Sequence, residues 1–168
     1  MYQIKDEQID QWIEAHKEQM LEDICELIRI RSVSAYDPNS PERPFGEGCA
    51  KVLLRALELC ERRGFRTRNY DFYCGTAVLP GTTSSSIGIF NHLDVVPEGN
   101  GWSFDPFSPF VRDGVLFGRG SMDNKGAAVM SLYTMMCLRE LAPKLKHSLI
   151  LCLGCNEEAG MKDIRHYL

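Results

Sequence analysis

Three short polar clusters hold the residues of this sequence whose types could support hydrolytic chemistry. The first contains His92 and Asp94, the second contains Asp123, and the third contains Glu157 and Glu158. Imidazole nitrogens and carboxylate oxygens are common ligands of zinc, and a carboxylate can also act as a general base. These residue types indicate a metal-dependent hydrolase, provided that the fold brings them together. The clusters read NHLD, SMDNKG and CNEEAG.

His92 and Asp94 are separated by one residue, so their side chains project to the same side if an extended strand continues through them. His92 could then ligate a metal while Asp94 accepts a hydrogen bond from the other ring nitrogen and fixes the tautomer. The alternative is a hydrogen bond within a structural loop, because His-x-Asp by itself is a weak motif.

Asp123 stands directly before a segment with helical, apolar character. Its side chain could cap that helix by accepting backbone N–H groups. It could instead bridge two metal ions roughly 3.5–4 Å apart, as carboxylates do in two-metal hydrolases. The local sequence does not choose between these two interpretations.

Glu157 and Glu158 follow the apolar run LILCLG, which reads as a buried strand. Two adjacent carboxylates at the end of such a strand repel each other unless a cation or solvent relieves them. Neighbouring residues of a strand point in different directions, so one Glu could ligate a metal while the other acts as a general base. A solvated acidic pair is the alternative.

Other residues that often do chemistry are given structural roles. Cys152 and Cys155 form one C-x-x-C without a second pair at zinc-finger spacing, so we expect them to be small apolar residues of a buried strand. We expect His16 to be a surface or boundary residue of a helix. His147 begins the strand that leads to Cys155, and about eight residues at roughly 3.3 Å each would place it far from the acidic pair.

The expected elements place all three clusters at one edge of a sheet. The order of helices and strands predicts an α/β fold with a mixed sheet flanked by helices, in which ligands gather beyond the carboxyl ends of strands. Asp113 and Gly114 lie between apolar flanks and predict a hairpin turn. Helices are expected at 7–30, 48–63 and 124–141, the last of them buried, and strands at 65–73, 75–80, 86–94 and 147–155.

Composition narrows the class of protein. The 168 residues carry a net charge of −4 with no basic stripe, which argues against a nucleic-acid partner. The longest apolar stretch, 127–138, is shorter than the roughly 20 residues of a bilayer span, so no membrane partner is expected. A charged N-terminus without a signal peptide and seven cysteines without a disulfide framework predict a cytoplasmic protein.

The clusters taken in order resemble a known family. The segments NHLDVVP, GWSFDPFSPFVRDGVLFGRGSMDNKG and CNEEAG are similar to those of the dinuclear zinc exopeptidases. That family includes acetylornithine deacetylase, succinyl-diaminopimelate desuccinylase, aminoacylase and carnosine dipeptidase. The segments PFGEG and EEAGMKDIRHYL resemble the bacterial PepV-type dipeptidases in particular, and the likeness runs from about Met20 to Leu168.

The resemblance implies an enzyme that hydrolyses the amide bond of a small peptide, with two Zn²⁺ ions, or Mn²⁺ or Co²⁺, activating a bridging water. It implies that His92 ligates one metal, Asp123 bridges both, and Glu158 ligates the other. Asp94 would orient His92, and Glu157 would be the general base. The resemblance also implies a cis peptide bond after Asp123.

The sequence departs from the family pattern at its C-terminal end. No further acidic ligand, distal histidine ligand or lid domain can be matched. We therefore expect residues 1–168 to be a truncated part of a catalytic domain, inactive alone, whose partner is the missing C-terminal part of the same enzyme. A deacylase acting on N-acyl amino acids and a non-catalytic, metal-binding or partner-dependent chain are the alternatives.

Overall fold

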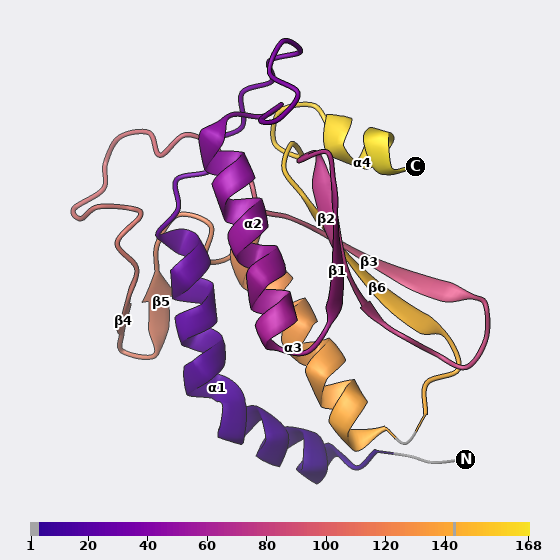
Figure 1. The fold of residues 1–168 in the computed structure, drawn as a ribbon. Coiled ribbons are helices and arrows are strands. Elements are labelled where there is room, and N and C mark those ends of the chain that lie inside the picture. Colours follow the sequence, from indigo (N-terminus) through magenta and orange to yellow (C-terminus); the bar gives the residue numbers. More distant parts are fainter. Residues whose placement is uncertain (1–3, 143) are drawn as a thin grey trace.

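The computed structural model describes residues 4–142 and 144–168, and each predicted segment forms the expected element (Figure 1). The ends of the three predicted long helices differ from the prediction by at most two residues. The helices are α1 (Asp6–Ile28), α2 (Glu47–Arg62), α3 (Lys125–Leu141) and α4 (Lys162–Tyr167). The strands are β1 (Arg66–Tyr70), β2 (Cys74–Leu79), β3 (Ser86–His92), β4 (Phe110–Arg112), β5 (Val115–Phe117) and β6 (Ser148–Gly154).

Local sequence explains where several elements stop. Gly64 follows α2 with a φ of 83°, a left-handed conformation that glycine adopts at helix ends without steric cost. Asp113 and Gly114 both have positive φ, 54° and 76°, as a tight turn between the short strands β4 and β5 requires. The predicted helix stop and the predicted hairpin are both confirmed.

The four-stranded sheet has the order β1-β2-β6-β3 and is mixed, as predicted. β2 is antiparallel to both β1 and β6, whereas β3 runs parallel to β6. In the parallel pair His92 is level with Gly154, so β3 and β6 end together. The polar residues that follow these two strands therefore begin at the same edge of the sheet.

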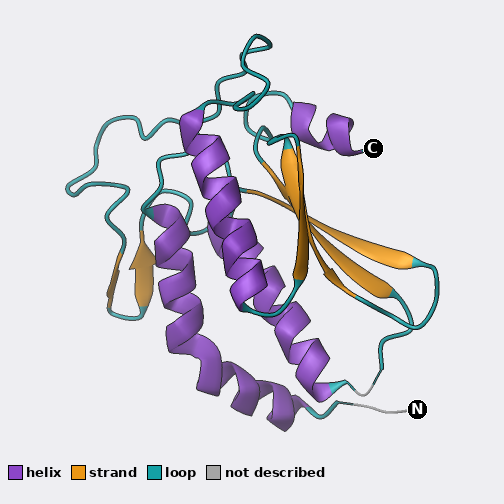
Figure 2. Ribbon diagram, in the orientation of Figure 1, coloured by secondary structure: helices purple, strands orange, loops and turns teal. Residues whose placement is uncertain are grey.

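Helices α1, α2 and α3 lie to one side of the sheet (Figure 2). Alternate residues of β6, namely Leu149, Leu151 and Leu153, join the hydrophobic core between this side of the sheet and the helices. The short helix α4 lies beside the upper ends of the strands, near the C-terminus (Figure 1). This arrangement leaves the strand ends open between α4 and the start of α3.

The prediction that α3 is buried is wrong for one side of the helix. Leu132 and Met135 are buried in the core, but Met130 remains 49% exposed. Contacts with α1 and the sheet cover only part of the helix circumference, and the remaining side borders a surface groove against α1. Within the part of the chain that is described, no helix combines the length and apolar character of a membrane span.

Candidate metal centre

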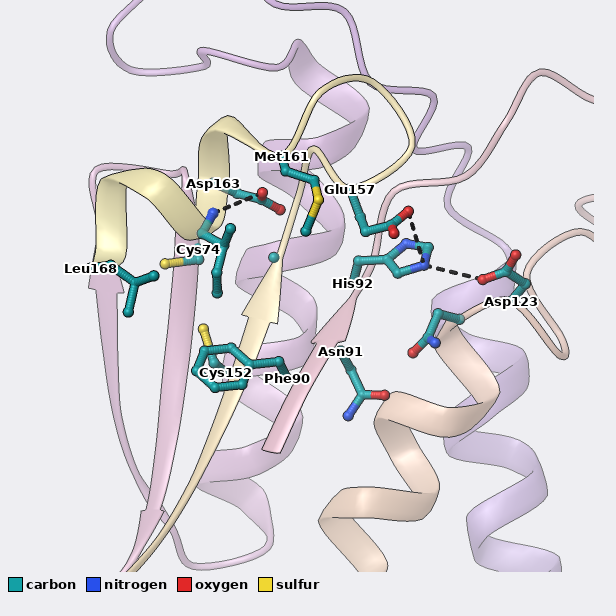
Figure 3. A pocket seen from close by; sticks show the side chains of 13 residues that line it. Cys74, Phe90, Asn91, His92, Asp123, Cys152, Glu157, Met161, Asp163 and Leu168 are labelled. Atoms are coloured by element: carbon teal, nitrogen blue, oxygen red, sulfur yellow. Dashed lines mark hydrogen bonds and ion pairs between the residues drawn. The ribbon is translucent and has the colours of Figure 1, made fainter. Parts of the chain in front are cut away.

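The sheet edge brings together the residues of all three polar clusters. His92 is the last residue of β3, Glu157 and Glu158 follow β6, and Asp123 precedes α3. His92 Nε2 lies 3.1 Å from Asp123 Oδ1 and 3.8 Å from Glu157 Oε2 (Figure 3). His92, Glu157 and Glu158 can each offer one ligand atom such that these atoms lie within 4.8 Å of one another. Their predicted convergence is confirmed.

Asp94 connects the histidine to the acidic loop. Its side chain is fully buried, and its two oxygens accept the backbone N–H groups of Glu157 at 3.2 Å and Glu158 at 3.1 Å. Its backbone carbonyl accepts the hydrogen bond from His92 Nδ1 at 3.0 Å. One residue therefore fixes the imidazole ring and the loop that carries both glutamates.

This geometry corrects one detail of the interpretation from the sequence. The sequence predicts that the carboxylate of Asp94 accepts the hydrogen bond from His92; Oδ1 lies 3.4 Å from Nδ1, and the shorter hydrogen bond, at 3.0 Å, goes to the carbonyl oxygen. The carboxylate is directed instead at the two amides of the loop. Asp94 still lies against the ring of His92, so the electrostatic effect of its charge remains.

The charges at the site favour a bound cation. Burial lowers the pKa of His92, but the hydrogen bonds and charge of Asp94 outweigh it and raise that pKa to about 9. Burial, together with the charge of Asp123, raises the pKa of Glu158. Without a metal, the imidazole thus carries a second proton at neutral pH, and the carboxylates repel one another. A divalent cation would replace that proton and relieve this repulsion.

Asp123 does not cap α3, so that interpretation of its role is wrong. The N-cap residue is Asn124, and the Asp123 carboxylate, 73% exposed, points toward His92 (Figure 3). The Asp123–Asn124 peptide bond is cis, which confirms the expectation from the family resemblance.

The two residues after Asn124 fix the turn that carries Asp123 against the rest of the fold. Lys125 is fully buried, and its ammonium group donates to the carbonyl oxygens of Leu27 at 3.0 Å and Ile30 at 2.7 Å, at the C-terminal end of α1. A Cβ atom at Gly126 would lie 1.9 Å from the carbonyl oxygen of Ser121, so only glycine fits there. Close backbone packing therefore determines the position of Asp123.

The residues present fit a zinc-like ion. Two ligand atoms each about 2.0 Å from a tetrahedral metal lie about 3.3 Å apart, and His92 Nε2 and Asp123 Oδ1 are separated by 3.1 Å. The donor set of one imidazole and several carboxylates suits a divalent cation of this kind.

The remaining histidines and the C-x-x-C pair lie outside this cluster. His16 stacks on Trp12, His166 stacks on Tyr73, and His147 hydrogen bonds to Ser85 at the opposite end of the sheet. Cys152 and Cys155 are buried free thiols, as expected.

Sequence reasoning missed three buried polar residues that support the site, namely Lys125, Asn156 and Asp163. Asn156 and Asp163 flank a turn that contains Gly160, and Asn and Asp in such positions often bond to loop backbone. That pattern is the signal that could have found them. For Lys125 the sequence offers no comparable signal, because lysine is almost never fully buried.

Comparison with known proteins shows which proteins carry similar sequences around this site. Residues 88–168 match the model of peptidase family M20/M25/M40. The Beta-Ala-Xaa dipeptidase of Lactobacillus delbrueckii subsp. lactis is 37% identical over 156 residues, which cover 92% of this chain and 33% of that protein. The chain spans about a third of the length of the curated relatives it matches.

Solved structures agree with this match. Human carnosine dipeptidase 1 superposes with a TM-score of 0.76 at 25% identity, over 92% of this chain and 35% of that protein. The dipeptidase Dug1p of Saccharomyces cerevisiae shares the fold with a TM-score of 0.78 at 18% identity, over 95% of this chain and 36% of that protein. The matched motifs, the sheet edge that they form and these likenesses show that residues 88–168 resemble peptidase family M20/M25/M40 and that the chain as a whole is similar to about a third of the length of known dipeptidases.

Proposed function

We propose that this chain contributes the metal-binding part of an enzyme that hydrolyses the amide bond of dipeptides. The observation that supports this most directly is the convergence of His92, Asp123, Glu157 and Glu158 at one sheet edge. The names of the relatives add support, because the Lactobacillus protein is a Beta-Ala-Xaa dipeptidase and the human protein is a carnosine dipeptidase. Because the chain spans about a third of such proteins, we also propose that it is one part of a larger catalytic domain.

Each side chain has a proposed role. His92 and Asp123 would hold one metal ion, and Glu158, together with Asp123, would hold a second. Two zinc ions, when bound, would supply polarisation of the scissile carbonyl and acidification of a water molecule. Glu157 would serve as the general base, because its carboxylate lies beside the proposed ligands, 3.8 Å from His92 Nε2. Asp94 fixes the ring of His92.

A pocket beside these residues can hold a small peptide. Its volume is about 620 Å³, within the range of roughly 300–1,000 Å³ that small-molecule sites occupy. His92, Asp123 and Glu157 line its polar part (Figure 3). Apolar groups, among them Phe90 and Met161, line the other part. A substrate carbonyl could thus approach the metal ligands while an apolar group is covered.

The test uses the protein in its full natural length, freed of metal with a chelator. Zn²⁺, Mn²⁺ or Co²⁺ is then restored separately, and hydrolysis is measured with β-alanyl dipeptides, α-dipeptides and N-acetyl amino acids. We expect turnover of dipeptides that disappears without metal and returns with it. Hydrolysis confined to the N-acetyl amino acids would replace the dipeptidase assignment with a deacylase, and full activity without metal would overturn the proposal.

A further inference from the structure

The loop that presents the two glutamates is closed by a buried asparagine. Asn156 is fully buried, and its amide side chain donates to Ser34 Oγ at 2.7 Å and accepts the N–H of Lys162 at 3.2 Å. Its backbone carbonyl accepts the N–H of Met161 at 2.7 Å. The exposed residues 157–160 therefore form a loop whose two ends are joined at Asn156.

Asp163 completes this closure from the first turn of α4. Its side chain is 3% exposed, and Oδ2 accepts the backbone N–H of Asn156 at 2.7 Å. Oδ1 accepts the backbone N–H of Ile164 at 2.8 Å (Figure 3). A Cβ atom at Gly154 would lie only 2.3 Å from Oδ2, so the carboxylate packs directly on the end of β6. Gly154 is the residue paired with His92, so Asp163 packs against the strand position that lies beside the proposed metal ligand.

Two buried carboxylates thus bind three consecutive amides. Asp163 accepts the N–H of Asn156, and Asp94 accepts those of Glu157 and Glu158. Hydrogen bonds to carboxylates are stronger than those between neutral groups, and breaking one in a buried place leaves an unpaired donor. The backbone that carries both glutamates is therefore fixed on both sides, although the glutamate side chains are themselves exposed.

Holding the backbone of the Glu157–Glu158 loop in place matters because several carboxylates lie close together at this site. Glu157, Glu158 and Asp123 repel one another without a cation, and a free loop would relieve that repulsion by moving outward. We propose that Asp163 is a positioning residue, which holds the Glu157–Glu158 loop at the metal centre before any metal is bound. This inference rests on the proposed function for its purpose, but the clamp itself can be tested without metal or substrate.

The experiment measures amide hydrogen exchange in the metal-free protein of full natural length, before and after Asp163→Asn. The substitution keeps the shape of the side chain, but both carboxylate oxygens accept backbone N–H groups, those of Asn156 and Ile164, so in either orientation the new NH₂ group faces a donor and strains the other bond. We expect exchange at residues 156–158 to accelerate about tenfold, as the loss of one such bond implies. We also expect the affinity for Zn²⁺ to fall at least about tenfold, as changes of outer-sphere residues do.

The matched control is Asp105→Asn. Asp105 also accepts a backbone N–H, that of Phe107 at 2.9 Å, but in an exposed loop outside the cluster. It should leave exchange at residues 156–158 and the Zn²⁺ affinity unchanged. If Asp163→Asn prevents folding, Ser34→Ala is used in its place. It removes the hydrogen-bond partner of the Asn156 side-chain amide and is also expected to accelerate hydrogen exchange at the backbone N–H of Asn156.

Two results would contradict the proposal. In the first, Asp163→Asn accelerates exchange only within α4 and leaves residues 156–158 and the Zn²⁺ affinity unchanged, so that Asp163 merely supports its own helix. In the second, Ser34→Ala and Asp163→Asn both leave the loop protected. Failure of the unaltered protein to bind Zn²⁺ would instead overturn the proposed function, and the exchange data would still decide whether the clamp exists.

Discussion

The carboxylate of Asp94 accepts the backbone N–H of Glu157 at 3.2 Å, across 63 residues of sequence. Because the carbonyl of the same residue binds the ring of His92, a shift of Asp94 would move a proposed metal ligand and the proposed base together. The site is therefore one connected unit, in which the acidic loop and the histidine share a support.

Substitution of each glutamate by glutamine should distinguish the role of the proposed base, Glu157, from that of the proposed ligand, Glu158. Glu157→Gln keeps the shape but removes the proton acceptor, so we expect turnover to fall about 10²–10⁴-fold while bound metal is retained. Glu158→Gln removes a charged ligand and should lower the metal content first. Metal analysis and steady-state kinetics on the protein of full natural length measure both quantities.

Glu18→Gln, a change on the exposed surface of α1, is the matched control and should alter neither quantity. Equal effects of Glu157→Gln and Glu158→Gln on metal content and on rate would show that the two roles are wrongly assigned.

Gly126→Ala should displace the turn that carries Asp123, because the new methyl group would meet the carbonyl oxygen of Ser121 at 1.9 Å. We expect a loss of about 1–3 kcal/mol in the free energy of unfolding and weaker metal binding. Urea denaturation and zinc titration test the two effects. Gly88→Ala is the control, since its closest neighbour is the ring of the exposed Phe90, which can move.

Alkaline pH should destabilise the fold through its buried thiols. Burial raises the pKa of Cys60 to about 12, from 9.0 in an exposed thiol. The thiol therefore ionises only in the unfolded chain between these values, and the stability that is present below pH 9 falls as the pH rises toward 12. The slope from this one group is at most about 1.4 kcal/mol per pH unit.

Urea denaturation at pH 8, 9 and 10 measures this slope, and Cys60→Ala should reduce it. Cys137→Ala serves as the comparison, because Cys137 is less buried and should contribute less to the slope. Identical slopes in the unaltered protein and in Cys60→Ala would show that the thiol does not contribute.

A protein that consists of residues 1–168 alone should bind zinc weakly and show no peptidase turnover. His92 and Asp123 would supply two ligands to one ion, and Glu158 and Asp123 two to the other, whereas catalytic sites usually have three protein ligands. Glu157 could complete a set with His92 and Glu158, but it would then cease to be a free base. Calorimetric titration and dipeptide assays would contradict this prediction by showing two tight sites with multiple turnovers.

The sequence predicts the elements well because each carries its own local signals. The helical spacing of apolar residues, Gly64 after α2, and the Asp113–Gly114 turn all act within a few residues of the feature they determine. The site residues were found by the likeness of three motifs considered together, since each motif alone allows a structural interpretation.

Among the residues that support the site, Lys125 could not be predicted from the sequence, because its role depends on distant partners, whereas Asn156 and Asp163 carry only a weak local turn signal. Lys125 donates to carbonyl groups almost a hundred residues away, whereas Asp163 bonds to Asn156 only seven residues away, in a turn whose shape the sequence does not specify. The sequence also does not show that the carboxylate of Asp94 accepts the backbone N–H groups of Glu157 and Glu158, so that its contact with the ring of His92 is shared between its carboxylate and its carbonyl oxygen.

The parallel pairing of β3 with β6 also has a consequence for how the protein folds. The chain must complete β4, β5 and α3 before β6 can join β3, and only that step brings His92 level with the acidic loop. Contacts between residues so far apart in sequence cost more chain entropy to close, and they form slowly. During synthesis, His92 therefore emerges from the ribosome well before the glutamates that follow β6, and these groups cannot bind a metal together until β6 has paired with β3.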